Sequence, residues 1–198
     1  MASDQQVALA LSAPGSLSIF RYTDYDVPFW ARPNSRPGRW NLGAQGPTQY
    51  WCMTPDGAWA ELIRAKELYT EDELDLVRMP LWVCRISTMW LIDLHDREAQ
   101  DKYGLTHARM IDDDWGPCQT AATELRRHCR GIVTPNAALD GHMNITLFGA
   151  RRAIDWRSKP ALGSTLPTAH TAVGRPVPGL IPFVRRQTPG GPQAQLFH

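Results

Sequence analysis

Residues 48–65, TQYWCMTPDGAWAELIRA, carry the clearest structural pattern in the chain. The first six residues alternate between aromatic and polar side chains, which is typical of a β-strand. Thr54 then suits a helix N-cap, Pro55 suits the first helical position, and Asp56 complements the positive end of the helix dipole. Apolar residues recur at helical spacing from there on, at Ala58, Trp59, Leu62, Ile63 and Ala65. This stretch therefore predicts a strand that leads directly into an amphipathic helix.

Glu61 is the one carboxylate within the predicted helix after its first turn. It stands beside the apolar stripe rather than opposite to it. Such a side chain either lies near a cleft or pairs with Arg64 or Lys66 on the surface, and the spacing leaves both possibilities open.

Further strands and helices are expected on both sides of this unit. Strand-like runs cover residues 15–23, 80–87, 89–94, 131–135 and 143–148. Residues 71–75 form an acidic linker or a short helical turn, and 97–103 form a short helix. A longer helix is expected over 118–129, capped by Asp112–Asp114 and stopped at Gly131. These expected strands and helices together predict an α+β fold with one core, which suits a chain of 198 residues.

The connection from residue 27 to residue 47 is long and rich in Pro, Gly, Asn, Ser and Arg. A loop of this length within a compact domain is usually either functional or disordered. Its arginines and aromatic residues favour a functional loop.

Three segments follow from the composition along the chain. Residues 1–15 form an N-terminal segment, residues 16–158 the domain that carries the candidate site, and residues 159–198 a Pro/Gly-rich extension in which no periodicity persists. The extension is expected to be largely extended, although its apolar residues 180–184 could pack on the domain.

Composition narrows the class of protein. A formal net charge of +1 is too small to indicate general, non-specific binding of nucleic acid. No apolar run approaches the roughly 20 residues that span a bilayer, and the first residues lack the basic start of a secretory signal. The scattered cysteines (Cys52, Cys84, Cys118, Cys129) form no metal-binding or redox motif, so buried thiols and a cytoplasmic location are expected.

Several residues in the first third of the chain would suit a dinucleotide with a cationic pyridinium ring. Arg21 and Arg39 offer planar guanidinium groups that match phosphate oxygens. Tyr22 and Tyr50 offer aromatic faces for the nicotinamide. Glu61 offers a carboxylate for the positive charge that develops on the ribose when the nicotinamide–ribose bond breaks.

By spacing alone this argument is weak, but a family resemblance strengthens it. The run Arg21-Tyr22, then GRWN at residues 38–41, then Tyr50 and then Ala60-Glu61 resembles the signature of the RES-domain family. The segments GIVTPNA at 131–137 and NITLF at 144–148 resemble the closing strand pair of that family. The resemblance covers roughly residues 16–149.

The resemblance implies an ADP-ribosyltransferase-like fold, with mixed or split central sheets and flanking helices, that binds NAD⁺ in a cleft. Arg21 and Arg39 would hold phosphate and ribose, and Tyr22 and Tyr50 would frame the nicotinamide. Glu61 would be catalytic, together with Arg39, and Trp40 would line the cleft. Asn136 stands where the family has its serine, so it would offer an amide to phosphate or ribose.

The resemblance also implies the activity, because characterised members are toxins of bacterial toxin–antitoxin pairs that deplete NAD⁺ by hydrolysis or phosphorolysis. An antitoxin protein is therefore the expected partner, and NAD⁺ the substrate. An ADP-ribosyltransferase acting on another acceptor is the first alternative. An inactive binding module, with Asn136 in place of serine as its mark, is the second.

No metal, membrane or nucleic-acid partner is expected. The aspartates at 112–114 are explained by helix capping, and Asp93, His95 and Asp96 alternate as in a strand. Residues 126–128, Arg-Arg-His, are expected to form a solvated face.

Overall fold

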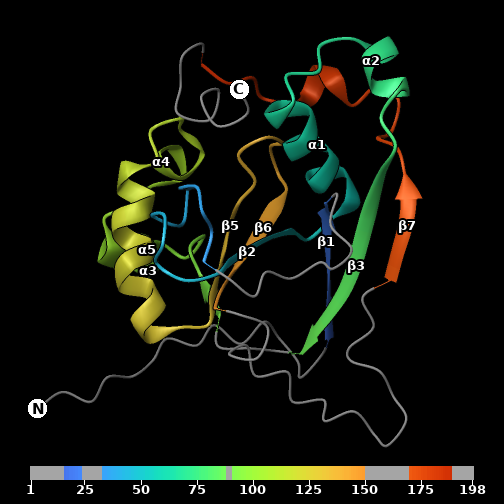
Figure 1. Ribbon diagram of the computed structural model, residues 1–198. Helices are drawn as coiled ribbons and strands as arrows, with labels where there is room; N and C mark the ends of the chain where they lie inside the picture. Colours follow the sequence, from blue (N-terminus) through green and yellow to red (C-terminus); the bar gives the residue numbers. More distant parts are fainter. Residues whose placement is uncertain (1–15, 24–32, 88–90, 150–169, 189–198) are drawn as a thin grey trace, which may run out of the picture.

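The computed structural model describes residues 16–23, 33–87, 91–149 and 170–188 (Figure 1). These residues form a mixed α+β fold around one sheet, as the sequence predicts. The strands are β1 (Ser16–Tyr22), β2 (Thr48–Cys52), β3 (Met79–Ser87), β4 (Leu91–Asp93), β5 (Gly131–Pro135), β6 (Met143–Phe148) and β7 (His170–Gly174). The helices are α1 (Pro55–Ala65), α2 (Glu71–Asp75), α3 (Arg97–Tyr103), α4 (His107–Ile111), α5 (Gly116–His128) and the 3₁₀ turn η1 (Ile181–Phe183).

The seven strands follow the order β4-β5-β6-β2-β1-β3-β7. Among the strands in the described ranges, β4 and β5 are parallel, and the other pairs are antiparallel. β1 and β2 share a single aligned pair, Phe20 with Cys52, whereas β1 aligns with β3 along its whole length from Ser16 to Tyr22. The sheet therefore consists of two well-paired halves that meet at a narrow junction between β1 and β2.

Helix α1 forms for the reasons that its sequence indicates. The Thr54 hydroxyl accepts the Gly57 backbone N–H at 3.1 Å, and proline occupies the first turn. Its apolar stripe packs against β1 and β2. The strand-to-helix unit predicted over residues 48–65 is thus confirmed.

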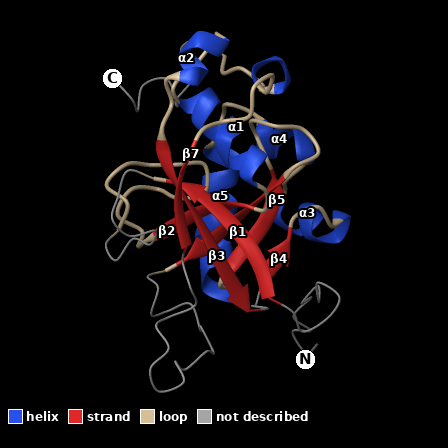
Figure 2. Cartoon of the chain, turned by 90° about the vertical axis from the view of Figure 1, so that its right-hand side faces the viewer, coloured by secondary structure: helices blue, strands red, loops and turns tan. Residues whose placement is uncertain are grey.

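The core has three parts. Helix α5 packs with residues of α3, α4 and β5. A second cluster lies between residues of β1, β2, β3, β5 and β6. A third joins α1 to the segment after β7 through Ile181 and Val184. Figure 2 shows α1, α2 and α4 gathered at one end of the sheet, with α5 behind the strands.

The C-terminal extension contributes more structure than its sequence suggests. Residues 170–174 add β7 to the edge of the sheet beside β3. Val184 bridges to Leu139, and the Arg185 backbone N–H donates to the Ala138 carbonyl at 2.8 Å. The prediction that residues 180–184 pack on the domain is confirmed. The segment boundary at 158–159 and the N-terminal segment 1–15 lie outside the described residues.

Other local expectations need correction. Helix α5 begins at Gly116, with Trp115 at the N-cap position in place of an aspartate and without a side-chain bond from that residue. The aspartates still satisfy the start of the helix, because Asp114 Oδ1 accepts the N–H of Gly116, the first helical residue, at 2.9 Å, and Asp112 Oδ1 accepts the Asp114 N–H. The strand expected over 89–94 is described as 91–93, because residues 88–90 lie outside the described part. Residues 71–75 form a helix with a complete capping box. All four cysteines are buried thiols outside any disulfide, as predicted.

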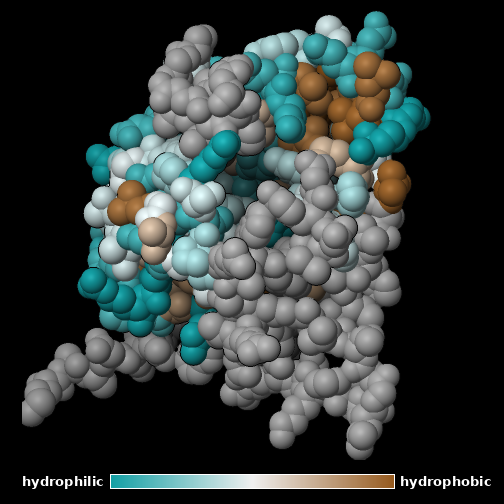
Figure 3. All heavy atoms as spheres, viewed as in Figure 1, coloured by the Kyte–Doolittle hydropathy of each residue, from teal (hydrophilic) through white to brown (hydrophobic). Residues whose placement is uncertain are grey.

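One surface region is unusually apolar. Figure 3 shows hydrophobic side chains at one corner of the viewed face, near α2 and β7. The exposed large hydrophobic residues in or next to α2, β7 and η1 are Leu76, Val173, Val177 and Phe183. Hydrophilic side chains surround the hollow nearer the centre of the same face.

Candidate active site

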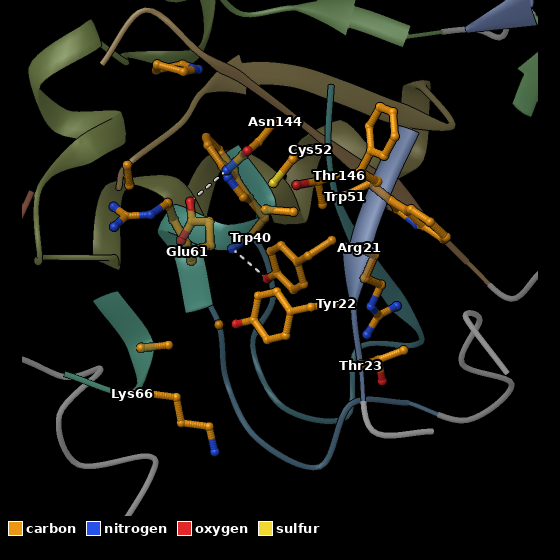
Figure 4. Close-up of a pocket in the computed structure, with 18 of the residues that line it drawn as sticks. Arg21, Tyr22, Thr23, Trp40, Trp51, Cys52, Glu61, Lys66, Asn144 and Thr146 are labelled. Atoms are coloured by element: carbon orange, nitrogen blue, oxygen red, sulfur yellow. Dashed lines mark hydrogen bonds between the residues drawn. The ribbon is translucent and has the colours of Figure 1, made fainter. Parts of the chain in front are cut away.

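A cleft of about 390 Å³ opens where the two halves of the sheet meet. All of the predicted site residues except Asn136 line it: Arg21, Tyr22, Arg39, Trp40, Tyr50 and Glu61. The structure thus brings together residues from β1, the 38–41 turn, β2 and α1 (Figure 4).

One wall of the cleft is the turn at residues 38–41 together with Tyr50, here called the turn wall. Gly38 and Asn41 exchange backbone hydrogen bonds of 2.9 and 3.2 Å. The Tyr50 hydroxyl donates to Asn41 Oδ1 at 2.6 Å and accepts the Trp40 N–H at 3.0 Å, which Figure 4 marks. Burial raises the pKa of Tyr50, so the hydroxyl keeps its proton and remains a donor. Tyr50 therefore fixes the turn while its ring lines the cleft.

Gly38 is required by this packing. A Cβ at residue 38 would lie 2.6 Å from the Tyr50 hydroxyl and 2.7 Å from Asn41 Oδ1. The absence of a side chain at residue 38 therefore makes room for the Tyr50 hydroxyl.

Arg126 supports the turn wall from α5. Its guanidinium donates to the Trp40 carbonyl at 3.1 Å and to the Thr48 hydroxyl, and it lies over the Phe148 ring at 4.5 Å. The expectation of a solvated face at residues 126–128 is therefore wrong for Arg126.

Arg39 extends from the turn toward the far side of the cleft. Its guanidinium donates to the Asp112 carbonyl and lies 5.9 Å from the centre of the Trp115 ring. Burial lowers the pKa of Arg39, while the charges of Cys118 and Glu61 act in the opposite direction. Arg39 is therefore a partly desolvated cation that interacts electrostatically with the Glu61 carboxylate.

The opposite wall consists of Glu61 on α1 and Asn144 on β6, here called the helix wall. Asn144 Nδ2 donates to Glu61 Oε1 at 2.9 Å, as Figure 4 shows. Arg64 takes no part in this contact, because it is buried elsewhere against the Ala137 carbonyl and Asp113. Of the two possibilities that the sequence left open for Glu61, the structure selects the cleft.

Arg64 and Asp113 form an ion pair behind the helix wall. The Arg64 Nη2–Asp113 Oδ1 distance is 2.5 Å. Burial alone would raise the pKa of Asp113, but the hydrogen bond from Thr188 and the Arg64 guanidinium lower it. Asp113 therefore ties α1 to the C-terminal segment, a role that capping did not predict.

Asn136 does not reach the cleft. It is buried, and its Oδ1 accepts the backbone N–H groups of Ala138 and Leu139, both at 2.8 Å. Its Nδ2 donates to the Gly57 carbonyl at 3.2 Å and to Asn144 Oδ1 at 2.8 Å. Both ends of the Asn136 amide are therefore bonded within the protein. The expected direct contact with a ligand is wrong for this geometry, and Asn136 can act on the cleft only through Asn144 and Gly57.

The strand β1 contributes the remaining side of the cleft. Arg21 donates to Gln49 Oε1 at 3.3 Å, and its guanidinium lies 5.9 Å from the centre of the Trp51 ring. The Tyr22 ring projects from β1 toward the cavity, and Thr23 follows it (Figure 4). Lys66, at the end of α1, lines the entrance.

The lining of the cleft also includes two β6 residues that the sequence analysis placed in a motif but did not name as site residues. Asn144 and Thr146 are two positions apart, so they face the same side of the sheet. They are aligned with Cys52 and Tyr50 of β2 and line the cleft with them. The signal was present in the sequence, because 143–148 alternates polar residues with the buried Ile145 and Leu147.

Two buried polar groups lining the cleft have no hydrogen-bond partner within the described residues. They are the Thr146 hydroxyl and the Trp115 indole N–H. Buried polar groups are normally satisfied, so these two are exceptions next to the cleft.

Neither a metal cluster nor a membrane helix is found in the part of the chain that the structure describes. No group of three or more His, Cys, Asp or Glu side chains there could hold a metal ion. No helix in these same ranges is long and apolar enough to cross a bilayer.

The fold has a counterpart among solved structures. The chain shares its fold with a chain in the crystal structure of the M. tuberculosis MbcT–MbcA toxin–antitoxin complex, with a TM-score of 0.60 and 22% sequence identity. This match covers 85% of the present chain and 88% of the other. The predicted α+β fold is therefore confirmed.

A sequence comparison points to a more particular relative. The chain is 27% identical over 127 residues to a Mycobacterium tuberculosis protein named "probable NAD(+) phosphorylase". The aligned region is 64% of this chain and spans 60% of the length of that relative. No protein-family model matches the chain.

Proposed function

We propose that this protein consumes NAD⁺ by cleaving the bond between nicotinamide and ribose, as an enzyme of the RES-domain type. The observation that carries the proposal is the placement of Glu61. Its carboxylate lines the cleft, accepts a hydrogen bond from the Asn144 amide and interacts electrostatically with Arg39. The similarity to a protein named as an NAD(+) phosphorylase supports the same activity.

Glu61 is the catalytic carboxylate. As nicotinamide leaves, positive charge develops at C1 of the ribose. A fixed carboxylate stabilises this charge more than it stabilises the ground state, and it can also hold a ribose hydroxyl. Because Asn144 occupies one oxygen, the other oxygen is available to the sugar.

The cations in the cleft hold the anionic part of the substrate. Arg39 and Lys66 line it, whereas the Arg21 guanidinium lies against Gln49 and Trp51 on the other side of β1 from the Tyr22 ring (Figure 4). A pyrophosphate spanning Arg39 and Lys66 would be positioned for the bond to break next to Glu61. The aromatic rings of Tyr22 and Tyr50 form flat surfaces on which the pyridinium ring can stack.

Inorganic phosphate is the favoured acceptor. In this reaction the C1–N bond to nicotinamide breaks with its electron pair going to nicotinamide, and a phosphate oxygen forms the new C1–O bond. The products are nicotinamide and an ADP-ribose phosphorylated at the former nicotinamide ribose. The relative named as an NAD(+) phosphorylase is the reason for preferring phosphate to water.

The protein acts as a toxin that an antitoxin protein restrains. The shared fold with a chain of a toxin–antitoxin complex supports this role. Since NAD⁺ is a cytoplasmic metabolite, the cytoplasm is the proposed place of action. Induced expression of the chain alone in bacteria should lower cellular NAD⁺ and stop growth, and the Glu61→Gln variant should do neither.

Product analysis tests the activity directly. Purified protein is incubated with NAD⁺, with and without inorganic phosphate, and the products are separated by chromatography and mass. A phosphorylated ADP-ribose that forms only with phosphate supports phosphorolysis, whereas free ADP-ribose in both tubes identifies a hydrolase. Intact NAD⁺ in both tubes would contradict the proposal and favour a transferase that lacks its acceptor, or an inactive module.

A further inference from the structure

Buried hydrogen bonds determine which end of the Asn144 side-chain amide, Oδ1 or Nδ2, faces Glu61. The argument begins at Asn136, whose Oδ1 accepts two backbone N–H groups, from Ala138 and Leu139. Only a carbonyl oxygen can accept both, so the Asn136 Nδ2 must point the other way, toward Gly57 O and Asn144 Oδ1. The backbone thereby fixes the orientation of the Asn136 side chain.

Asn136 in turn fixes Asn144. Because Asn136 Nδ2 is a donor, the Asn144 atom that faces it at 2.8 Å must be the acceptor Oδ1. The Asn144 Nδ2 then faces Glu61 Oε1 at 2.9 Å as a donor. Glu61 Oε1 is therefore held as an acceptor, and any proton on this carboxyl must sit on the oxygen that Asn144 does not touch.

Asn136 also forms a hydrogen bond with α1, the helix that carries Glu61. Asn136 Nδ2 reaches the Gly57 carbonyl in the first turn of α1. A Cβ on Gly57 would lie 3.0 Å from that nitrogen, so the glycine allows the close approach. Asn136 thus acts on Glu61 in two ways, through Asn144 and through the start of α1.

We propose that Asn144 is a positioning residue for Glu61, and that Asn136, although outside the cleft, determines which end of the Asn144 amide meets the carboxylate. This three-residue relay deepens the proposed function and rests on Glu61 being the catalytic carboxylate. It also gives the asparagine at position 136 a structural purpose, since its paired acceptor and donor ends are both needed.

Asn136→Asp is the informative variant. An aspartate keeps both acceptor contacts with the backbone but cannot donate to Asn144. Asn144 then turns its amide to donate to the new carboxylate and presents Oδ1 to Glu61, so two acceptors face each other. We expect kcat to fall by about 10- to 100-fold while KM for NAD⁺ changes little, because the substrate does not touch position 136.

A stability measurement tests the relay without any need for activity. In the Glu61→Gln background, the introduced glutamine can turn its amide and donate to the inverted Asn144. The melting temperature lost through Asn136→Asp should therefore be smaller by about 3 °C or more in the Glu61→Gln background than in the wild-type background. Additive losses would overturn the relay, since residues 136 and 61 would then be uncoupled.

Two further variants keep the test decisive. If Asn136→Asp does not fold, Asn144→Asp replaces it, because it also sets a carboxylate against Glu61 and should also be rescued by Glu61→Gln. Gln100→Glu is the matched control, since Gln100 donates its amide to the Leu94 carbonyl at 2.8 Å away from the cleft. It should lose melting temperature additively with Glu61→Gln and leave kcat unchanged.

The two readouts separate the relay from the proposed function. If the wild-type protein leaves NAD⁺ intact with and without phosphate, the proposed function fails, and the melting-temperature comparison still decides the relay. If the wild type turns over NAD⁺ but Asn136→Asp keeps its full kcat, the proposed function stands and the relay is wrong.

Discussion

The two walls of the cleft are held in place by contacts of very different sequence range. In the turn wall, Tyr50 reaches Asn41 only nine residues away, and both belong to one recognisable run of sequence. In the helix wall, Glu61 is held by Asn144, 83 residues later in the chain. The contacts within the turn wall are thus local, although Arg126 of α5 also supports it, whereas the contact that holds Glu61 in the helix wall exists only once β6 has paired with β2.

This difference predicts how each wall responds to substitution. Changes in the turn wall should act on the stability of the turn and on ligand binding. Changes in the helix wall should act on turnover, because its contacts converge on one carboxylate.

Glu61→Gln should have the largest effect. Turnover of NAD⁺ should fall by at least about 10², as expected for the loss of one preorganised charge at the reacting centre. The fold should persist, because a glutamine Oε1 can still accept the Asn144 N–H. Steady-state kinetics and thermal unfolding check both points, and unchanged turnover would remove Glu61 from the mechanism.

Arg39→Ala should weaken binding more than turnover. The loss of a charged hydrogen-bonding group costs about 1.5–3 kcal/mol, which corresponds to roughly 10- to 150-fold in affinity. Calorimetric titration of NAD⁺ into the Glu61→Gln background measures this without turnover. Arg109→Ala is the matched control, since Arg109 bonds to the Gly104 carbonyl away from the cleft. If the two variants bind equally well, the turn wall does not hold the substrate.

Gly38→Ala should destabilise the turn wall by about 1–3 kcal/mol, the usual cost of overpacking. The added Cβ would lie 2.6 Å from the Tyr50 hydroxyl. Gly43→Ala is the control, because a Cβ there meets nothing closer than the Ser35 carbonyl at 3.6 Å. Urea unfolding of both variants gives the comparison, and equal stabilities would show that Tyr50 does not require a glycine at position 38.

Asp113→Asn should remove a pH-dependent part of the stability behind the helix wall. The pKa of Asp113 is lowered in the folded state, so its contribution is present above the unfolded value of about 3.9 and is lost as the pH falls through the folded value. The variant should be less stable by about 1.5–3 kcal/mol at neutral pH, and this gap should close in acid. A gap that stays constant down to acid pH would show that the carboxylate charge is not what stabilises this contact.

Thr146→Val should have the smallest effect. Its buried hydroxyl has no partner among the described residues, so the isosteric change should leave the melting temperature unchanged or slightly higher. If a substrate group bonds to this hydroxyl, KM should rise several-fold, by roughly one neutral hydrogen bond of about 1 kcal/mol. A clear loss of stability with unchanged KM would instead assign the hydroxyl a structural role.

The same contrast explains what the sequence revealed. The strand-to-helix unit, the residues of the turn and the candidate carboxylate were all predicted, because capping residues, periodicity and a short motif are local signals. Asn144 and Thr146 were not named as site residues because their importance depends on the register between β6 and β2. Asn136 was placed at the ligand by its position in a motif, and only the structure shows that both ends of its amide are already bonded.

The C-terminal part also contains structure that its local sequence pattern does not predict. Residues 170–174 carry no strong strand pattern, yet they pair with β3 because that edge of the sheet offers unpaired backbone groups. The Arg64–Asp113 ion pair likewise joins groups 49 residues apart, and no local pattern links the two residues. Such contacts depend on the whole fold and leave little trace in a local pattern.

The most direct test of the account is a crystal structure of the Glu61→Gln variant with NAD⁺ bound. The account predicts that the nicotinamide ribose lies within hydrogen-bond distance of residue 61, between the turn wall and the helix wall, with the pyrophosphate beside Arg39. NAD⁺ bound elsewhere, or bound here with its nicotinamide ribose far from residue 61, would contradict the central claim.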